Sequence, residues 1–294
     1  MTKLFDHAKA PYLLILPSIL VITAVAFYPI LKAAYLSLFE INLKFNVNNF
    51  IGIANYFQLL QDNSFFNALL NTLYFVGVSL FFELILGLLI ALVINQPLKG
   101  KGLVKAVILI PWAIPTVVSA KMWKWIFNYD YGILNYLLKF LHLISDNWNW
   151  LGSKTFAMNS AILAEIWKTT PFMVLLLFAG LQVIPEDLYK SAKVDGAGVW
   201  YRFWHITLPL LKPTLLVAVL FRALDAFRVF DVIFVLTGGG PADTTEVLSL
   251  YTYKQLFSLS NFGYGSALAV VTFVCVMVFS SLFIKLFGLS LETR

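Results

Sequence analysis

Seven ionisable side chains fall inside or near the long apolar runs of this sequence. They are Glu83, Glu165, Lys168, Arg222, Asp225, Arg228 and Asp231. An ionisable group at the centre of a membrane helix costs at least about 2.5–3.5 kcal/mol, so it normally faces a partner or a water-filled cavity. Such groups either form a polar path for a hydrophilic solute or make ion pairs that lock helices together.

Two sets of these side chains are patterned along a helix. Glu165 and Lys168 are three residues apart and can pair on one helix face. The segment FRALDAFRVFD places Arg222, Asp225 and Val229 on one helical stripe. Any single member is as readily structural as functional, but for the stripe taken together we favour a solute pathway.

The sequence offers no constellation for catalysis or metal binding. His7, His142 and His205 lack the H-E-x-x-H spacing of zinc enzymes. The single cysteine, Cys275, lies in an apolar run and shows no metal-ligand spacing. The segment GKGLVK lacks the spacing of a nucleotide-binding P-loop. We therefore expect no catalytic residue, no bound metal and no cofactor on this chain. Since no basic run is interleaved with aromatic residues, we expect no nucleic-acid partner either.

The elements that carry these residues are expected to be membrane helices. The chain of 294 residues is 60% hydrophobic and 12% charged, far more apolar than a soluble domain. A span of the bilayer needs roughly 20 apolar residues. Six runs qualify, at 12–37, 67–95, 104–127, 157–183, 213–236 and 265–288. We predict an all-α membrane protein that forms one domain over residues 1–294, with PWAIP (111–115) as a kink in the third span.

Six crossings place both termini on the same side of the bilayer. Basic residues are more frequent in the N-terminal tail, the 96–105 loop, the 184–212 loop and the C-terminal end than in the opposite loops. The positive-inside rule therefore puts these segments and both termini in the cytoplasm of a multi-pass cell-membrane protein.

A polar stretch, YKSAKVDGAGVWYRFWHITLPLLKP (189–213), interrupts the apolar chain. Pro185 suits a first helical turn, and Gly196 with Gly198 stops or turns the chain. We predict two short helices with a bend, ending where Pro209 and Pro213 break the chain at the membrane. Small residues leave room for the surface of a partner to approach closely.

This stretch resembles the EAA loop of permease subunits of bacterial and archaeal ABC importers. The family pattern is roughly E-A-A-x-x-D-G-A, followed further on by I-x-L-P. The residues that match are Asp195, Gly196, Ala197, Ile206, Leu208 and Pro209. The segments FYPILKAAYLSLF, FIGIANYF, NTLYF, ILIPWAIP, PFMVLLLFAGLQVIPEDLY and VLTGGGPADTT are similar to the carbohydrate-importer branch, and to its MalF-like permease type.

The resemblance implies that the loop at 184–212 is a coupling helix that docks on a cytoplasmic ATPase. The positions that would couple are Glu186, Lys190, Ser191, Ala192, Asp195, Gly196, Ala197 and Pro209. The usual Glu of the family falls on Lys190, so its salt bridge with the ATPase is not carried over. Glu186 or Asp187 could replace that acidic function.

The resemblance also implies a solute path between two homologous permease subunits. The matching positions and their polar neighbours are Lys168, Thr169, Phe172, Arg222, Asp225, Ala226 and Val229. The implied partners are a second permease subunit, a P-loop ATPase dimer that carries ATP and Mg, and an extracytoplasmic solute-binding protein that faces the segment after VLTGGGPADTT.

The expected solute is a di- or oligosaccharide that crosses by alternating access. Lys168 and Arg222 leave a sugar phosphate or glycerol phosphate open as the solute. An ion-coupled secondary carrier would explain the buried carboxylates but not the DGA loop, and a membrane-embedded enzyme lacks candidate residues.

Overall fold

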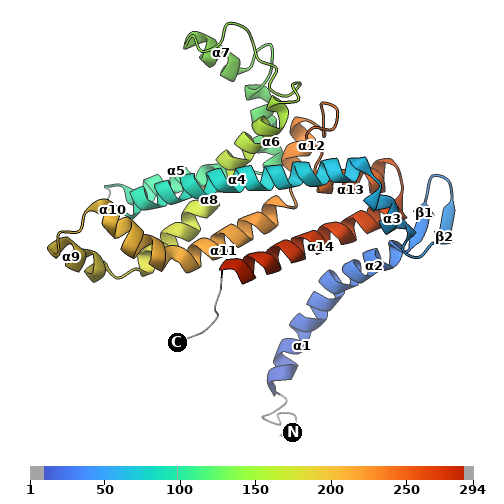
Figure 1. Ribbon diagram of the computed structural model, residues 1–294, viewed down its shortest axis with the longest axis horizontal. Helices are drawn as coiled ribbons and strands as arrows, with labels where there is room; N and C mark the ends of the chain where they lie inside the picture. Colours follow the sequence, from blue (N-terminus) through green and yellow to red (C-terminus); the bar gives the residue numbers. More distant parts are fainter. Residues whose placement is uncertain (1–9, 98, 288–294) are drawn as a thin grey trace. The chain divides into compact units, whose positions relative to one another are not determined.

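Long apolar helices form most of the chain (Figure 1). The structure is a computed structural model that describes residues 10–97 and 99–287. Within these ranges, 5 helices are long and apolar enough to cross a membrane, and the number rises to 6 if a bent pair counts as one span. The predicted all-α, six-span fold is confirmed.

The elements follow one another in a simple order, with three single π-helical turns (η) between helices. They are α1 (Ala10–Ile22), η1 (Thr23–Phe27), α2 (Tyr28–Leu36), β1 (Phe39–Asn42), β2 (Val47–Phe50), α3 (Ala54–Leu60), α4 (Asn63–Asn95), α5 (Lys101–Ala113), α6 (Thr116–Ile126), α7 (Ile133–Phe140), α8 (Phe156–Val183), α9 (Glu186–Val194), α10 (Val199–Arg202), η2 (Phe203–Thr207), α11 (Leu208–Ala226), α12 (Asp231–Leu236), α13 (Leu248–Tyr253), η3 (Lys254–Ser258) and α14 (Phe262–Phe287). The spans predicted first, second, fourth and sixth correspond to α1–α2, α4, α8 and α14. The end predicted for the sixth span, residue 288, lies outside the described residues.

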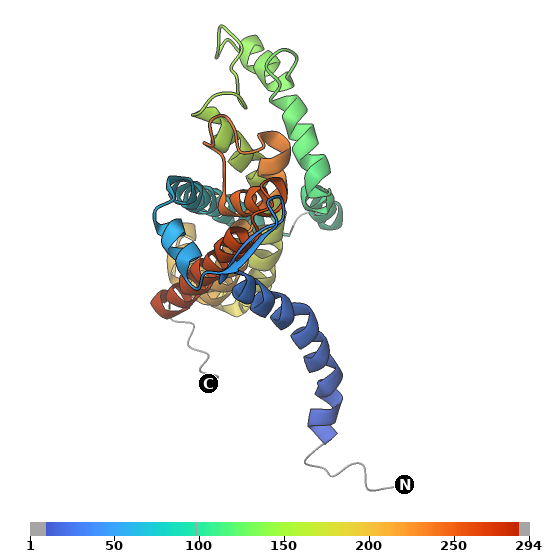
Figure 2. The same cartoon turned by 90° about the vertical axis from the view of Figure 1, so that its right-hand side faces the viewer.

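The third span is broken rather than gently kinked. Helices α5 and α6 meet at 89°, and this right-angle turn is visible in Figure 2. The residue before a proline avoids the helical region, and Ile114 accordingly has φ −73° and ψ 131°. Pro115 follows with ψ 137°, so two successive extended residues form the corner.

The structure corrects the predicted start of the fifth span. The helix runs unbroken from Val199 to Ala226, so Pro209 and Pro213 do not end it. In η2, just before Pro209, the Leu208 N–H bonds to the Phe203 carbonyl. Such a turn shifts the bonding from i+4 to i+5 and so accommodates the donor that proline lacks. Membrane helices tolerate a further proline such as Pro213 because neighbouring groups pair with the freed carbonyl.

The predicted end of the same span, at 236, is also wrong. The helix stops at Ala226, and α12 is a separate short helix. The last turn tightens through a 3.0 Å bond from the Arg228 N–H to the Asp225 carbonyl. Phe230 then leaves the helical region with φ −138°. The polar residues that gave the sequence its charged stripe therefore sit at a helix end.

The chain divides into two compact units by its internal contacts. One unit contains the part before Asn63 together with Tyr251–Cys275. In this unit β1 and β2 form an antiparallel hairpin in which Phe39 lies opposite Phe50. This hairpin is a small addition to the all-helical expectation.

Side-chain hydrogen bonds hold the first unit together. The Asn55 amide donates to the Ser37 carbonyl (2.8 Å) and the Phe39 carbonyl (2.9 Å). The Asp62 carboxylate accepts from the Tyr264 hydroxyl at 2.5 Å and also from Tyr251. Burial, and then the hydrogen bond to Asp62, raise the pKa of Tyr251 to about 12. This tyrosine therefore stays a neutral hydrogen-bond donor at physiological pH.

Helices α4 and α8 form the centre of the second unit, which contains Asn63–Leu250 and the part after Cys275. They run side by side (Figure 1). Their shared core includes Ala91, Met173 and Leu177, all fully buried. Gly87 lets the two helices approach, since an ideal Cβ there would lie 2.5 Å from Met173 Cγ and 2.9 Å from Met173 Cβ.

Gly87→Ala should destabilise this helix pair. The added methyl group would force Met173 or the backbone to move, which typically costs about 1–3 kcal/mol. The expected result is a lower thermal unfolding midpoint of the detergent-purified complex. Gly77→Ala is the matched control on the same helix, because a Cβ there meets nothing within 4 Å. Equal midpoints for the two variants would show that the close approach at Gly87 does not matter.

Candidate functional site

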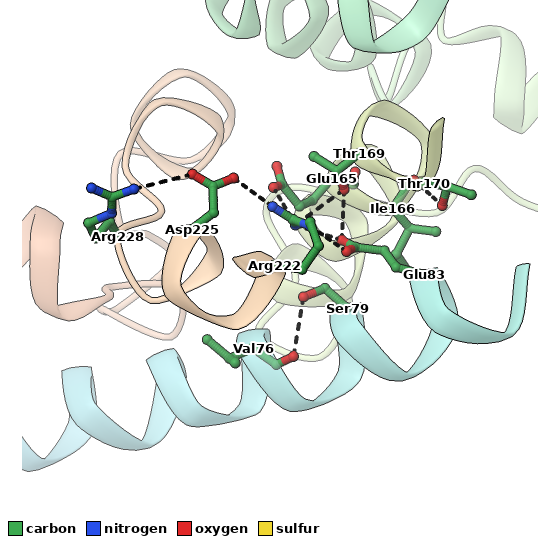
Figure 3. A network of polar contacts seen from close by, with 10 residues as sticks. All are labelled: Val76, Ser79, Glu83, Glu165, Ile166, Thr169, Thr170, Arg222, Asp225 and Arg228. Carbon is green, nitrogen blue, oxygen red and sulfur yellow. Dashed lines mark hydrogen bonds and ion pairs between the residues drawn. The ribbon is translucent and has the colours of Figure 1, made fainter. Parts of the chain in front are cut away.

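A buried arginine joins three helices at the centre of the second unit (Figure 3). Arg222 on α11 is 2% exposed, and Glu83 on α4 is fully buried. The Arg222 Nε donates to Glu83 Oε2 at 2.7 Å, and its Nη2 donates to Glu83 Oε1 at 2.9 Å. This is the bidentate geometry that makes Arg–carboxylate pairs strong.

Two more carboxylates and a hydroxyl complete the arginine's coordination. Arg222 Nη2 also donates to Glu165 Oε1 on α8 at 3.3 Å, and Nη1 donates to Asp225 Oδ2 at 2.6 Å. The Thr169 hydroxyl accepts a hydrogen bond from Arg222 Nη2 at 3.3 Å and donates one to Glu83 Oε1 at 2.7 Å. We call Glu83, Glu165, Arg222 and Asp225 the charged cluster. It ties α4, α8 and α11 together through ion pairs that are largely removed from water.

The charged cluster is buried at Glu83 and exposed to solvent at Asp225. The Asp225 side chain is 62% exposed and lies 3.7 Å from Arg228 Nη2, whose side chain is 72% exposed. Glu165 was predicted to be able to pair with Lys168, but the structure pairs it with Arg222. Within the described residues, the Lys168 amine makes no hydrogen bond or ion pair. A free cation therefore remains beside the cluster.

A polar pocket of about 130 Å³ opens where α11 ends and α12 begins. We call it the polar pocket; it is lined by Thr116, Glu165, Lys168, Thr169, Asp225, Arg228, Val229, Phe230, Asp231 and Val232. These residues come from α6, α8, the end of α11, α12 and the segment that joins α11 to α12. The broken third span and the broken fifth span thus meet at one polar cavity, which is where backbone irregularity is tolerated in membrane proteins.

The structure brings four of the predicted pathway residues to this pocket, namely Lys168, Thr169, Asp225 and Val229. The other three lie elsewhere. Arg222 is held inside the charged cluster, Phe172 packs against Trp112 with ring centroids 5.8 Å apart, and Ala226 is buried beside Val76 and Phe227. The predicted transport roles of all seven remain predictions.

Sequence reasoning recognised Glu83 as an ionisable residue in an apolar run but did not place it in a site. Its only signal was that a lone carboxylate in the 33-residue helix α4 must have a partner. Asp231 was counted among the seven ionisable residues but was not selected for the site, and it lines the polar pocket. Nothing in the sequence indicated that Thr116 lines the pocket. It does so because the bend between α5 and α6 places the start of α6 there.

The predicted loop at 184–212 contains two short helices, α9 and α10, joined by a tight turn. The Ala197 N–H bonds to the Ala192 carbonyl at 2.8 Å, and the Gly196 N–H bonds to the Lys193 carbonyl at 3.1 Å. This pair of bonds is a Schellman motif, which needs a left-handed residue. Gly196 supplies it with φ +78°. The D-G-A sequence is therefore a helix stop with a defined geometry.

The eight predicted coupling residues form an open surface. Glu186, Lys190, Ser191, Asp195, Gly196 and Pro209 are exposed, and Ala192 and Ala197 are half-buried. Lys190 is neutralised within its own helix, with Nζ 3.1 Å from Asp187 Oδ1 and 3.7 Å from Glu186 Oε2. No residue of α9 is buried. Tyr189 packs, partly buried, against the core shared by α4 and α8, whereas Leu188 and Val194 of the same helix are exposed.

Comparison with known proteins places this architecture in a family. The family model of binding-protein-dependent transport system inner membrane components matches residues 83–291. The chain belongs to this family. The trehalose/maltose transport system permease protein MalF of Thermococcus litoralis is 43% identical over 281 residues, covering 96% of this chain and 94% of that protein. The trehalose transport system permease protein SugA of Mycobacterium tuberculosis is 44% identical, covering 95% and 89%.

A solved structure has the same fold as this family member. It is a bacterial alginate ABC transporter in complex with an alginate pentasaccharide-bound periplasmic protein. The TM-score is 0.83 at 25% sequence identity, and the match covers 99% of both chains. The chain is therefore a multi-pass permease component of a binding-protein-dependent ABC importer.

Proposed function

We propose that the chain is the MalF-like permease subunit of an ATP-driven importer that passes a di- or oligosaccharide of the trehalose and maltose type into the cytoplasm. The observation that carries this proposal is the similarity, over nearly the whole chain, to permeases named for trehalose and maltose transport. We propose that the sugar crosses at the polar pocket.

The polar pocket suits a shared solute site. Its volume of about 130 Å³ is below the roughly 300–1,000 Å³ of typical ligand pockets. This chain would therefore supply one wall, and the second permease subunit would supply the other. Lys168, Thr169, Asp225 and Asp231 offer both donors and acceptors to sugar hydroxyls.

The charges around the polar pocket favour an uncharged solute over a sugar phosphate or glycerol phosphate. Lys168 and Arg228 are opposed by Glu165, Asp225 and Asp231, so the lining carries no excess of positive charge. An ion-coupled carrier is also less well supported. Its buried carboxylates, Glu83 and Glu165, are both engaged by Arg222 and are not free to take up a coupling ion.

The exposed loop at 184–212 supports the rest of the assembly. In this proposal α9 docks on an ATPase dimer that binds ATP and Mg, and the loop and both termini are cytoplasmic. An extracytoplasmic binding protein delivers the sugar at the opposite face. Closure of the ATPase dimer then switches the permease pair between inward-open and outward-open states.

The proposal is tested with the tagged chain purified in gentle detergent from its native cells. A second six-span subunit and a P-loop ATPase should co-purify. Proteoliposomes of that complex, given the cognate binding protein, should take up labelled trehalose or maltose only with ATP inside. Uptake of a sugar phosphate in place of both sugars would overturn the assigned solute. Uptake by this chain alone, without ATP, would overturn the importer assignment.

Lys168→Gln should lower sugar uptake without impairing assembly. The Lys168 amine lines the polar pocket and makes no ion pair with the described residues, so its loss costs no internal contact. A hydrogen bond to a charged group contributes about 1.5–3 kcal/mol, so we expect uptake to fall roughly tenfold. The measurement is initial uptake rate per assembled complex.

The control for Lys168→Gln is Lys121→Gln, which removes the same charge from an exposed position on α6 outside the polar pocket. It should transport at the normal rate. If both variants transport normally, Lys168 does not contact the solute.

A further inference from the structure

A second pocket lies beside the loop at 184–212. It is at the other end of the helix Val199–Ala226 from the polar pocket. It has a volume of about 360 Å³, and we call it the loop pocket. Its walls come from the end of α4, the end of α8, and the loop helices α9, α10 and η2. The Tyr189 hydroxyl and the Thr207 hydroxyl, 3.0 Å apart, close one side. It shares no residue with the polar pocket.

Two cations face the loop pocket without neutralising partners. Lys193 and Arg202 both line it, and no acidic residue does. In the described part of the chain, neither side chain makes a hydrogen bond or an ion pair. Lys190, one turn before Lys193, differs because Asp187 and Glu186 neutralise it.

The backbone adds to this positive potential. The helix Val199–Ala226 begins at the loop pocket, and Val199 is one of the lining residues. The first bond of this helix runs from the Arg202 N–H to the Gly198 carbonyl, so the N–H groups before it point outward. The start of a long helix favours an anion. Two free cations and a helix start therefore converge on one cavity.

The remainder of the loop pocket is apolar and lies where two spans end. Leu92, Leu181 and Phe203 form part of its wall beside the cations. The apolar helix α4 ends at Asn95, and α8 ends at Val183. An apolar wall with a cationic rim at the ends of membrane spans matches an amphiphile with an anionic head. A free phosphate would use only the rim.

We infer that the loop pocket binds the headgroup of an anionic phospholipid of the phosphatidylglycerol class. The phosphate lies between Lys193 and Arg202, and the start of the acyl chains lies along Leu92 and Phe203. Basic pockets between membrane helices on the cytoplasmic side recognise such lipids. With the loop cytoplasmic, as proposed above, the bound lipid belongs to the inner leaflet and joins the loop helices to the ends of α4 and α8.

The test uses the full importer complex, delipidated in detergent and supplied with phosphatidylglycerol and phosphatidylcholine. Native mass spectrometry counts the lipids that remain bound. The wild-type complex should retain phosphatidylglycerol in preference to phosphatidylcholine. The pair Lys193→Gln with Arg202→Gln should retain it roughly thirty-fold less tightly, because each basic group near an anionic lipid contributes about 1 kcal/mol, which is about fivefold in affinity.

The matched control removes two other lysines from the same side of the protein. Lys101 and Lys105 lie over the Phe178 ring, at 5.2 and 4.1 Å from its centroid, and do not line the loop pocket. Lys101→Gln with Lys105→Gln should leave the retained phosphatidylglycerol unchanged. Equal losses in both pairs would mean general surface attraction and would overturn the site. Lys193→Gln alone, at an exposed position, guards against misfolding and should give an intermediate loss.

Two further results would also overturn the inference. Displacement of the lipid by inorganic phosphate alone would mean an anion site without a lipid. Loss of the ATPase subunit from the Lys193→Gln, Arg202→Gln complex, with lipid retention unchanged, would assign the loop pocket to the ATPase interface. Because lipid retention needs no transport, this test succeeds or fails independently of the sugar proposed as solute.

Discussion

Replacing Arg222 by methionine should leave almost no assembled importer. Methionine fills much of the arginine's volume but leaves Glu83 and Glu165 buried without a counter-charge. Removing one partner of a buried ion pair costs about 3–5 kcal/mol, a large fraction of the stability of a typical protein. The measurement is the yield and thermal midpoint of the detergent-extracted complex.

The decisive comparison adds Glu83→Gln and Glu165→Gln to the Arg222→Met chain. Neutralising the stranded carboxylates should restore much of the yield, because an uncharged replacement of a buried pair is often tolerated. A stable Arg222→Met complex that no longer transports would contradict this structural role of Arg222. Arg222 would then contact the solute, as the charged stripe in the sequence first suggested.

Gly196→Trp should uncouple ATP hydrolysis from uptake while leaving the protein inserted and folded. Gly196 has φ +78°, and a Cβ there meets nothing within 4 Å of the chain. The substitution therefore costs only the left-handed strain of about 1–2 kcal/mol. The indole projects from the surface at which the ATPase is proposed to dock. ATP-driven uptake should fall to background, measured against the amount of complex in the membrane.

Gly100→Trp is a closely matched control for that experiment. Gly100 has φ +73° and equally open surroundings, and it precedes α5 outside the loop at 184–212. It carries the same backbone strain and the same added indole, so uptake should remain near normal. If both variants lose uptake, strain is the cause. If neither does, Gly196 is not part of a docking surface.

The sequence was sufficient for the spans because their signal is local. The runs that became α4 and α8 are long and mostly apolar, and a bilayer requires such runs to be helical. The fifth span was mispredicted at both ends for a local reason too. A π-helical turn, η2, accommodates Pro209, and the helix stops at Ala226 although most residues from 227 to 236 are apolar. Hydropathy alone does not distinguish a helix that continues from one that ends and restarts.

The site was only partly predictable because its contacts are long-range. The spacing of Arg222 and Asp225 places them one turn apart, and the structure shows them as an ion pair at 2.6 Å. Glu83, however, is 139 residues from its partner Arg222 in the sequence. Residue spacing predicts contacts only within one helix or strand, so it could not predict this pair. The same holds for Thr116, which enters the polar pocket through the 89° corner at Pro115.

In the proposed transport cycle, the unbroken helix from Val199 to Ala226 would act as a lever between the loop and the polar pocket. Its 28 residues, at 1.5 Å per residue, make a rod about 40 Å long. Each degree of swing about one end displaces the other end by about 0.7 Å, by the same geometry. The far end carries Asp225 at the polar pocket and is fastened to α4 and α8 through Arg222. A swing of only a few degrees at the loop would thus reshape a cavity of about 130 Å³, and three spans would turn with it.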